Sequence, residues 1–418
     1  MLNVDQALET IPSYIQTLEE EDCPLIRLPG RVAAADVYSD LNVPAWNYAA
    51  QDGFAVRSQD IAGASASHPQ FLKVIDAVRV GTVSHCDVGP QTAVRIMTGA
   101  PIPQGADCVV RFEDTDEDQR RQLDLSSEEI GILVPEKSGG NIRPAGEKIT
   151  RGSLIITRGS RLGPAEIGMA AALGQTGLKV IRQPVAAIIP TGDELVEPGQ
   201  TLQGPQVYNS WAYTLAAQVR RCGGIPRLLG VARDRRTSIR SKIKRGISSD
   251  LIITCGGTAG GDYDLVKDIL SGLGEMVFWR VRMAPGASFA FGVVHQSLNG
   301  LSRRVPLFAL AGNAPANMVN FEVLVRPALL KMLGRPAPWI DSVEAVLEDS
   351  FENKKNSRCY VWVQLQKHQG SYSARISRTP EKGILPSVAL ADGLAVIPEN
   401  KSKVEAGETV QVQLLDWY

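Results

Sequence analysis

The pattern of apolar and polar residues changes three times along this chain of 418 residues. Residues 3–20 carry apolar side chains at helical spacing, which predicts an amphipathic helix that is broken or kinked at Pro12. Residues 43–138 contain short apolar runs separated by glycine and proline, as in a β-rich module. We therefore expect the first third of the chain to combine a helix with β-structure.

Strand-like apolar runs alternate with helical patterns from about residue 184 to residue 333. Strands are expected at residues 185–189, 225–231, 251–254 and 305–310, and helices at 209–222, from 234 or 237 onwards, at 264–273 and at 313–333. Repeated β–α units of this length predict a parallel, doubly wound sheet. Ligands of such sheets bind beyond the carboxyl ends of the strands.

The period becomes two after the proline-containing segment 334–338. Residues 360–366 and 409–415 alternate between apolar and polar side chains, which predicts strands. The C-terminal region is therefore expected to form a small β-barrel or sandwich.

The segment 251–264 is the most informative part of the chain, because an apolar run leads there into glycines and carboxylates. The residues concerned are Gly256, Gly257, Gly260, Gly261, Asp262 and Asp264. A turn from strand to helix presents backbone N–H groups to an anion, and the two acids can hold a divalent cation that bridges to that anion. The spacing fits neither the dinucleotide fingerprint nor the P-loop. The alternative is a tight turn without a ligand.

Composition narrows the classes of function. A net charge of −1 argues against a general nucleic-acid or membrane-surface binder. Six scattered cysteines without a C-x-x-C pair make zinc and iron–sulfur sites unexpected. The N-terminus has no signal-peptide pattern and no run of 18 apolar residues occurs, so a cytoplasmic protein is expected. Residues 220–245 are strongly basic, which indicates a solvated helix face or, alternatively, a rim that attracts an anionic substrate.

Five segments together resemble the motifs of the molybdopterin molybdenumtransferases (MoeA and the E domain of gephyrin), in the family's order. They are A-Q-D-G-F-A-V at 50–56, R-I-M-T-G-A-P-I-P at 95–103, G-G-N-I-R-P-A-G-E at 139–147, T-G-D-E-L at 191–195 and G-G-T-A-G-G-D-Y-D at 256–264. The resemblance extends over essentially the whole chain.

This resemblance implies a multidomain α/β protein that forms an elongated homodimer. Each subunit would contain a discontinuous mixed α/β domain (1–42 and 139–180), a β-rich domain (43–138), a MogA-like molybdopterin-binding α/β domain (181–333) and a C-terminal β-barrel domain (334–418).

The resemblance also implies a transferase of molybdenum cofactor biosynthesis. Members of the family insert molybdate into adenylylated molybdopterin with Mg²⁺ and release AMP, in a cleft that the partner subunit's β-rich domain completes. Position by position, the implied catalytic residues are Asp52, Thr98, Glu194 and Asp264. The expected partners are a second subunit, the pterin nucleotide, and another cofactor-biosynthesis protein or a molybdoenzyme.

Further residues are assigned to the substrate and to the cation. Substrate contacts are expected at Gly256, Gly257, Gly260, Gly261, Arg280, Arg282, Gly312 and Asn313, and metal contacts at Glu194, Asp262 and Asp264. Each has a simpler interpretation: Asp262 can cap the following helix, Glu194 can be a surface acid at a strand end, and the Asp52 and Thr98 segments can be turns.

The chain departs from the family pattern where anion contacts should be densest. Ala284 and Ala287 stand where the family has lysines, and Arg280 and Arg282, expected on one face of one strand, are the candidate replacements. Three hypotheses follow: an active molybdenumtransferase, a non-catalytic paralogue that binds molybdopterin as a carrier or partner-binding subunit, and an enzyme acting on another phosphorylated compound.

Overall fold

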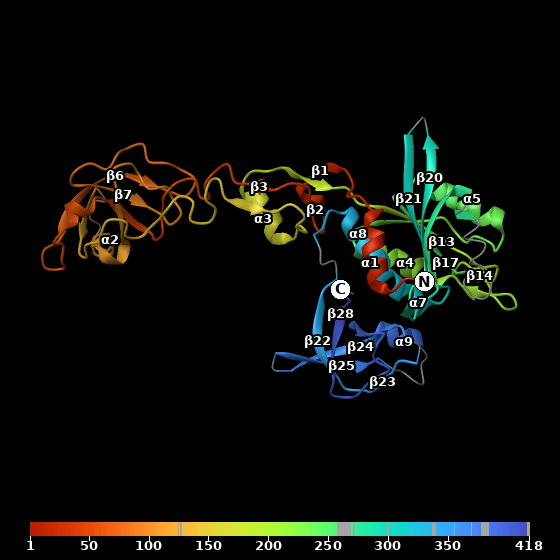
Figure 1. Ribbon diagram of the computed structural model, residues 1–418. Helices are drawn as coiled ribbons and strands as arrows, with labels where there is room; N and C mark the ends of the chain where they lie inside the picture. The colour runs from red at the N-terminus through yellow and green to blue at the C-terminus, as the bar shows by residue number, and fades with distance from the viewer. Residues whose placement is uncertain are drawn as a thin grey trace. The chain divides into compact units, whose positions relative to one another are not determined.

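The computed structural model describes residues 1–123, 125, 128–256, 269–270, 272–298, 301–336, 340–354, 356–368, 370–377 and 384–415. The chain forms two compact units (Figure 1). Unit 1 comprises residues 1–35, 158–163 and 177–418, and unit 2 comprises residues 36–157 and 164–176.

Unit 2 is built around a five-stranded sheet in the order β8-β5-β7-β6-β9, in which only β6 and β7 run parallel. Its strands are β3 (Val37–Tyr38), β4 (Tyr48–Ala49), β5 (Gly53–Val56), β6 (Gln70–Val78), β7 (Thr92–Ile96), β8 (Cys108–Arg111), β9 (Glu129–Ile132), β10 (Ile142–Arg143) and β11 (Leu154–Ile156). Its helices are η2 (Ser58–Ile61), η3 (Phe112–Asp114), α2 (Glu117–Gln122) and α3 (Pro164–Ala172). The strand-rich character expected for residues 43–138 is confirmed.

Unit 1 begins with α1 (Val4–Ser13) and a small sheet of β1 (Glu20–Pro24), β12 (Gly177–Ile181) and β2 (Val32–Ala33), with η1 (Leu25–Arg27) between β1 and β2. The helix predicted for residues 3–20 is therefore too long. Pro12 lies in its last turn, and Tyr14 caps it. A proline has no N–H with which to continue the hydrogen-bond ladder, and the chain leaves the helix two residues later.

The centre of unit 1 is a six-stranded sheet in the order β16-β13-β17-β21-β20-β18. The strands are β13 (Val185–Pro190), β16 (Ile225–Leu228), β17 (Leu251–Cys255), β18 (Gly274–Trp279), β20 (Ala290–Leu298) and β21 (Leu301–Leu310). β16, β13, β17 and β21 run parallel, which confirms the α/β expectation. β20 and β18 add an antiparallel edge that the sequence pattern did not indicate.

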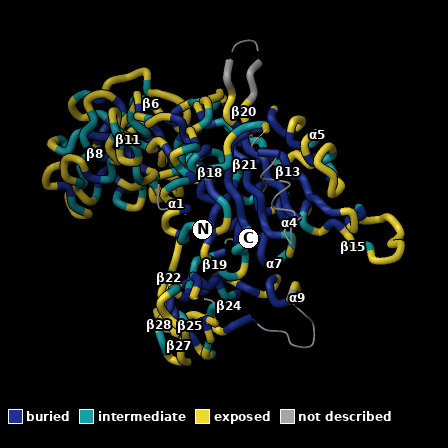
Figure 2. Tube along the Cα trace, turned by 45° about the vertical axis from the view of Figure 1, so that its right-hand side comes forward, coloured by how far each residue is buried: buried dark blue, intermediate teal, exposed yellow. Residues whose placement is uncertain are grey.

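Helices cover both faces of this sheet. They are α4 (Ser210–Arg221), α5 (Arg236–Gly246), and the consecutive segments α7 (Ala314–Asn320), the π-helical η4 (Phe321–Val325) and α8 (Arg326–Met332). Alternate residues of one strand point to opposite faces, so Ala186 and Ile188 pack with α4 and α8 whereas Ala187 and Ile189 pack with α5. Burial on both faces explains the continuous apolar runs of these strands, which are dark blue in Figure 2.

The C-terminal strands of unit 1 close into a five-stranded barrel, because β24 pairs with both β25 and β26. The elements here are β22 (Ser342–Leu347), β23 (Phe351–Glu352), β24 (Arg358–His368), β25 (Ser371–Ile376), α9 (Ile384–Ala389), β26 (Gly393–Ile397), β27 (Lys403–Val404) and β28 (Thr409–Leu414), and β19 (Met283–Ala284) joins the edge of β24. The barrel alternative of the sequence prediction is thus confirmed. The remaining short strands are β14 (Leu195–Val196) and β15 (Val207–Tyr208).

Candidate functional site

Three parallel strands of unit 1 end at the same level. Pro190 of β13 is in register with Cys255 of β17, and Cys255 is in register with Leu310 of β21. The segments that follow these strands therefore start side by side at one edge of the sheet, with neighbouring strands about 4.8 Å apart. Three of the predicted site segments begin here: 191–195, 256–264 and 311–313.

Gly256 opens the glycine-rich segment under tight packing. Its φ is +105°, and a Cβ there would lie 2.1 Å from the carbonyl oxygen of Thr191. The Thr191 N–H donates to the carbonyl oxygen of Cys255 at 2.7 Å, which joins the two segments. Only glycine fits this position, so its identity is explained by the close approach of two backbones. The neighbouring predictions Gly257, Gly260, Gly261, Asp262 and Asp264 lie outside the described residues.

Hydrogen bonds from residues in the loop after β16 fix the position of the segment after β13. The Asp193 N–H donates to Asp234 at 3.2 Å, and the Asp234 N–H donates back to Asp193 at 3.3 Å. Arg233 Nη1 donates to the Asp193 carbonyl oxygen at 2.6 Å. The exposed carboxylate of Glu194 follows, and within the described part of the chain it accepts no side-chain hydrogen bond. Sequence reasoning missed Arg233 and Asp234 as supports, since it interpreted the basic segment as a solvated helix face or an anion-attracting rim, and residue 234 as a possible helix start.

Two asparagines hold the segment after β21, the exposed Asn313 and the buried Asn320. Asn313 caps α7, its side chain accepting from the Ala316 N–H at 3.3 Å. Asn320, fully buried, accepts from the Ala311 N–H at 3.2 Å and donates to the Gly286 carbonyl oxygen at 2.8 Å. Asn320 thus connects Ala311, next to Gly312, to the segment that contains Ala284 and Ala287. A carboxamide inside the apolar pattern of 313–333 was the signal that sequence reasoning passed over.

Gly286 lacks the side chain that would block the approach of the Asn320 amide to its backbone. Its φ is +98°, and a Cβ there would lie 2.4 Å from Asn320 Nδ2. Ala284 and Ala287, on either side, are half-buried. The backbone path of this segment is therefore fixed by Gly286 and Asn320, with the methyl groups of Ala284 and Ala287 beside them.

Arg280 and Arg282 do not lie on one face of one strand, so that prediction is wrong. β18 ends at Trp279, Arg280 has a φ of +61° and stacks over the Trp279 ring at 5.1 Å, and Arg282 lies in a bend. A left-handed residue between them removes the two-residue alternation of a strand. Trp279 is in register with Ala290, and Ala290 with Ala309, so Arg280 still lies at the same edge of the sheet, two strands from β21.

Asp52 and Thr98 are brought together in unit 2. The Thr98 N–H and hydroxyl both donate to Asp52 Oδ1, at 2.7 and 2.8 Å. These two bonds, with the charge of Arg95, hold the pKa of Asp52 below its ordinary value. Both residues are exposed. The arrangement is an ionised carboxylate in a fixed orientation at the surface of the β-rich unit.

The described residues contain no group of three His, Cys, Asp or Glu side chains placed to hold a metal ion. Of the three expected ligands, only Glu194 is described. Its exposed carboxylate has the chemistry of a Mg²⁺ ligand, but one carboxylate does not make a site.

Known proteins resemble this chain over its full length. Residues 2–174 match the MoeA N-terminal region (domain I and II), residues 187–331 a probable molybdopterin binding domain, and residues 344–415 the MoeA C-terminal region (domain IV). Molybdopterin molybdenumtransferase from Bacillus subtilis is 32% identical over 99% of this chain and 94% of its own length. Molybdopterin molybdenumtransferase 2 from Mycobacterium tuberculosis is 32% identical over 99% of each chain.

Two solved structures also resemble this chain over nearly its full length. The structure of a molybdopterin biosynthesis MoeA protein from Pyrococcus horikoshii has a TM-score of 0.86 and is 32% identical, with 99% of each chain covered. A second MoeA structure from that organism has a TM-score of 0.79 and is 25% identical, covering 99% of this chain and 100% of its own. Within the described residues, no helix has both the length and the apolar character that a bilayer crossing requires.

Proposed function

This chain belongs to the molybdopterin molybdenumtransferases, a family of transferases of molybdenum cofactor biosynthesis, and we propose that it inserts molybdate into adenylylated molybdopterin with release of AMP. The observation that best supports this proposal is that Pro190, Cys255 and Leu310, at the ends of three parallel strands, are in register with one another. This register brings the starts of three segments, at Thr191, Gly256 and Ala311, to one edge of the sheet, where backbone N–H groups can receive phosphate.

The reaction needs a phosphoanhydride to be split by water into two phosphate monoesters, one of which is AMP. Backbone N–H groups at Gly256 and Gly312 would orient the anionic substrate, together with Asn313 and Arg280. Arg282 and the glycines at 257, 260 and 261 remain proposed contacts.

We assign Glu194, Asp262 and Asp264 to a Mg²⁺ ion, which would neutralise phosphate charge when bound. The exposed carboxylate of Glu194, which accepts no side-chain hydrogen bond from the residues that the structure describes, supports its part of this assignment. Asp264 is proposed as catalytic on its position in the G-D-Y-D motif alone.

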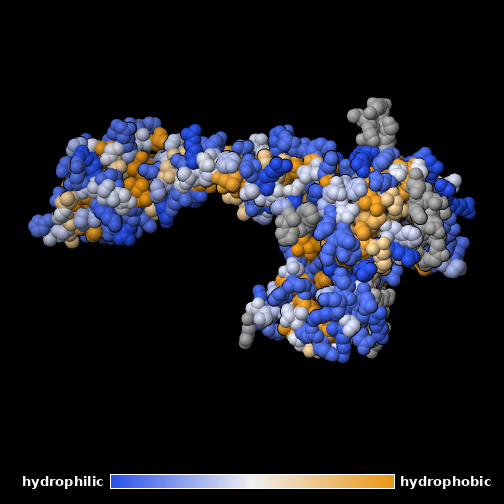
Figure 3. All heavy atoms as spheres, viewed as in Figure 1, coloured by the Kyte–Doolittle hydropathy of each residue, from blue (hydrophilic) through white to orange (hydrophobic). Residues whose placement is uncertain are grey.

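Asp52 and Thr98 are proposed to act in the site of a second subunit. Their pairing in unit 2 gives an oriented carboxylate that stays charged at neutral pH, as a group that handles a proton or a cation requires. The exposed apolar side chains of unit 2, among them Trp46 and Phe71, support an interface with another subunit; orange residues interrupt the hydrophilic surface of that unit in Figure 3. We therefore propose a homodimer acting in the cytoplasm, with partners among other cofactor-biosynthesis proteins or molybdoenzymes.

We also propose the four-domain division given above, with boundaries near residues 42, 138, 180 and 333. The matches to separate family models at 2–174, 187–331 and 344–415 support the last two boundaries, since none of the models crosses them.

The second candidate is a paralogue that binds the pterin nucleotide without turnover. Ala284 and Ala287 favour it, because each removes a cation where a dianion would bind, and a lost charge-stabilising donor costs about 10²–10³ in rate.

One assay tests both functions. Purified protein is mixed with molybdopterin adenylate, Mg²⁺ and molybdate, and AMP release and cofactor formation are followed. Turnover of both supports the transferase, and Asp264→Asn should then abolish AMP release while Glu9→Gln, an exposed acid on α1, leaves it unchanged. Tight binding without AMP release supports the second candidate, and absence of binding contradicts both in favour of another phosphorylated substrate.

A further inference from the structure

Trp211 lies at the edge of the sheet where the three parallel strands end. It is the second residue of α4, and the residues just before it are tied to the segment after β13. The Asn209 N–H donates to the Val196 carbonyl oxygen at 2.8 Å. The Val207 N–H donates to the Glu194 carbonyl oxygen at 2.9 Å. These bonds hold the first turn of α4 close to the segment that carries Glu194.

The indole ring of Trp211 packs where two of the site segments meet. A Cβ on Gly256 would lie 3.0 Å from Trp211 Cζ3, as well as 2.1 Å from the Thr191 carbonyl oxygen. Gly256 is the first residue after β17, and Thr191 is the first residue after β13. The ring therefore borders the backbone at which we propose that phosphate binds.

Packing accounts for only part of this side chain. Trp211 packs against the core below α4, yet it is only half-buried, whereas Ala212 and Leu215 of the same helix are buried. Its indole N–H forms no hydrogen bond with any residue that the structure describes. A tryptophan N–H usually has a partner when it is buried, so an N–H without one suits a position that faces solvent or a ligand.

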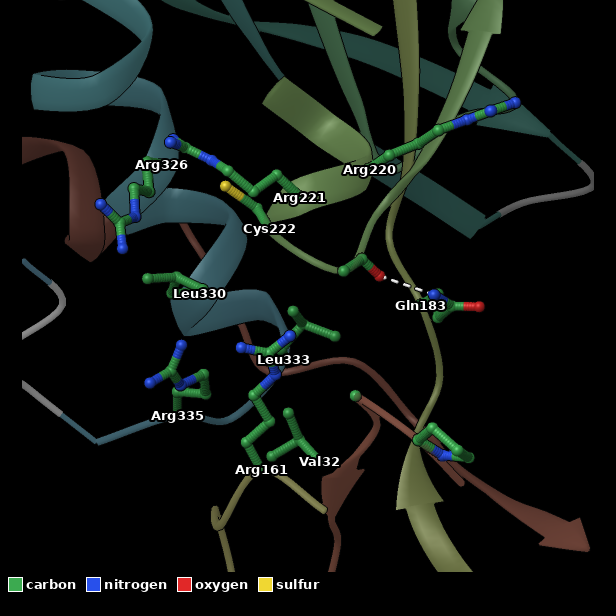
Figure 4. A pocket seen from close by; sticks show the side chains of 13 residues that line it. Val32, Arg161, Gln183, Arg220, Arg221, Cys222, Arg326, Leu330, Leu333 and Arg335 are labelled. Carbon is green, nitrogen blue, oxygen red and sulfur yellow. Dashed lines mark hydrogen bonds between the residues drawn. The ribbon is translucent and has the colours of Figure 1, made fainter. Parts of the chain in front are cut away.

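The cavity shown in Figure 4 is a different feature, at the opposite end of α4. Gln183, which lines it, precedes the first residue of β13, whereas the proposed site follows the last, and the six residues of this strand span about 20 Å. Arg221 and Arg326, which also line it, form ion pairs with the buried Glu322 and so link α4, η4 and α8. Trp211 is not among the described residues that line this cavity.

We propose that Trp211 stacks on a planar heterocycle of the substrate and thereby selects phosphorylated compounds that carry such a ring. The inference rests on the proposed function, because it takes the anion to lie at the backbone of Gly256. A heterocycle a few atoms from the phosphate would meet the indole ring, since that ring contacts Gly256 itself. Adenine and pterin both have a flat π face on which aromatic side chains stack. A phosphate ester without a ring would gain nothing from Trp211.

Calorimetric titration with AMP and with ribose 5-phosphate tests the proposal, because the two compounds differ in the adenine base. We expect the unaltered protein to bind AMP at least about tenfold more tightly than ribose 5-phosphate. Trp211→Ala should weaken AMP binding about tenfold and leave ribose 5-phosphate binding within about twofold. Trp211→Phe keeps an aromatic face and should bind AMP within about threefold of the unaltered protein.

A phosphorylated pterin, neopterin monophosphate, is titrated in the same way to identify the heterocycle. A loss in Trp211→Ala with AMP alone places adenine on the indole ring, and a loss with the pterin alone places the pterin there. Either result supports the proposal.

Tryptophan fluorescence gives a readout that a purely structural role would not change. A heterocycle stacked on an indole quenches its emission, so Trp211→Phe should still bind the ligand but lose most of the ligand-dependent quenching. Tyr372→Ala is the control, because it removes a partly buried aromatic ring from the C-terminal barrel. It should change neither the binding ratio nor the quenching.

Two results would overturn the inference: equal weakening of AMP and ribose 5-phosphate in Trp211→Ala, or unchanged binding of both heterocyclic compounds. The ring would then only fill the space between α4 and β17, and the proposed transferase would be unaffected, because AMP release is measured separately. Failure of the unaltered protein to bind either heterocyclic compound would contradict both proposals. Thermal unfolding without ligand shows whether each variant is folded. If Trp211→Ala is unfolded, Trp211→Leu replaces it, with the same loss expected.

Discussion

Thr98 donates two hydrogen bonds to one oxygen of Asp52, one from its backbone and one from its side chain, at 2.7 and 2.8 Å. Residues 46 positions apart are thereby joined at the surface of unit 2. The pair gives Asp52 a fixed orientation and a pKa below its ordinary value.

Thr98→Val should move the pKa of Asp52 back toward its ordinary value. The substitution removes the hydroxyl donor and keeps the backbone donor, so the charged form loses part of its stabilisation. A group with a lowered native pKa stabilises the fold above the unfolded-state pKa, and this contribution is lost as pH falls through the native pKa. NMR titration of the Asp52 carboxyl carbon measures the change. Thr115→Val is the control, because the Thr115 hydroxyl donates to the Phe112 carbonyl oxygen and not to Asp52. An unchanged pKa of Asp52 in Thr98→Val would contradict the assignment.

Gly256→Ala should destabilise the protein and abolish turnover, because the new Cβ would meet the Thr191 carbonyl oxygen at 2.1 Å. Gly199→Ala is the matched control, since Gly199 has a similar φ of +94° and open space around it. The control should lose about 1–2 kcal/mol of unfolding free energy from backbone strain, and Gly256→Ala about 1–3 kcal/mol more from overlap. Denaturant unfolding measures both values. Equal losses would mean that the contact with Thr191 is of no consequence.

Asn320→Ala should lower kcat about 10²-fold, because the two segments that it connects lose their mutual position. The unfolding free energy should fall by about 1–3 kcal/mol as a buried backbone donor and acceptor lose their partner. Asn317→Ala is the control. Asn317 is equally buried, but among the described residues its amide makes no hydrogen bond. The rate of AMP release separates the two variants, and similar rates would contradict a positioning role for Asn320.

Glu322→Gln should cost about 3 kcal/mol of unfolding free energy, since removing one charge from a buried pair leaves the other charge poorly compensated. Glu147→Gln breaks the ion pair with Arg143 at the surface and should leave the stability close to that of the unaltered protein. Urea unfolding of both variants at one pH gives the comparison. A small loss in Glu322→Gln would show that the cations are balanced by other groups.

Asp250 should contribute to acid unfolding. Burial alone would raise the pKa of Asp250, but hydrogen bonds from Arg182 and the Val185 N–H, and the charge of Arg303, hold it below its ordinary value. Its stabilising contribution is therefore complete above the unfolded pKa of about 3.9 and declines as pH falls below it. Asp250→Asn should be less stable at pH 7 by about 3 kcal/mol and should lose less stability between pH 5 and pH 3. Parallel pH dependences in the two proteins would contradict this account.

Most of the fold could be predicted from the sequence where one physical signal dominates. β13 and β17 are buried on both faces, so their apolar runs are continuous, and the cap of α4 at Asn209 was visible as a side chain that can accept from a free N–H. The antiparallel edge of β18 and β20 was not predicted, because Gly274–Trp279 is only partly buried and shows no clear period.

The arrangement of some candidate site residues could be predicted. The family resemblance singled out Asp52 and Thr98, which the structure places in hydrogen-bond contact. Strand ends singled out Glu194, Gly256 and Asn313 as candidates, whose roles remain proposals. The supports Arg233, Asp234 and Asn320 depend on contacts between segments far apart in sequence, and no local pattern contains that information. The left-handed conformation of Arg280, which separates it from Arg282, is likewise set by its surroundings.

The shared level of Pro190, Cys255 and Leu310 has an evolutionary consequence. Deleting one residue from β17 would withdraw Gly256 by about 3.3 Å and exchange the two faces of the strand, so that every following contact would be lost at once. A change of side chain at Ala284 or Ala287, by contrast, would alter the local charge or size and leave that alignment untouched. Side chains at the sheet edge can therefore change without disturbing the fold, whereas a change in the length of any of the three strands would misalign the segments that follow.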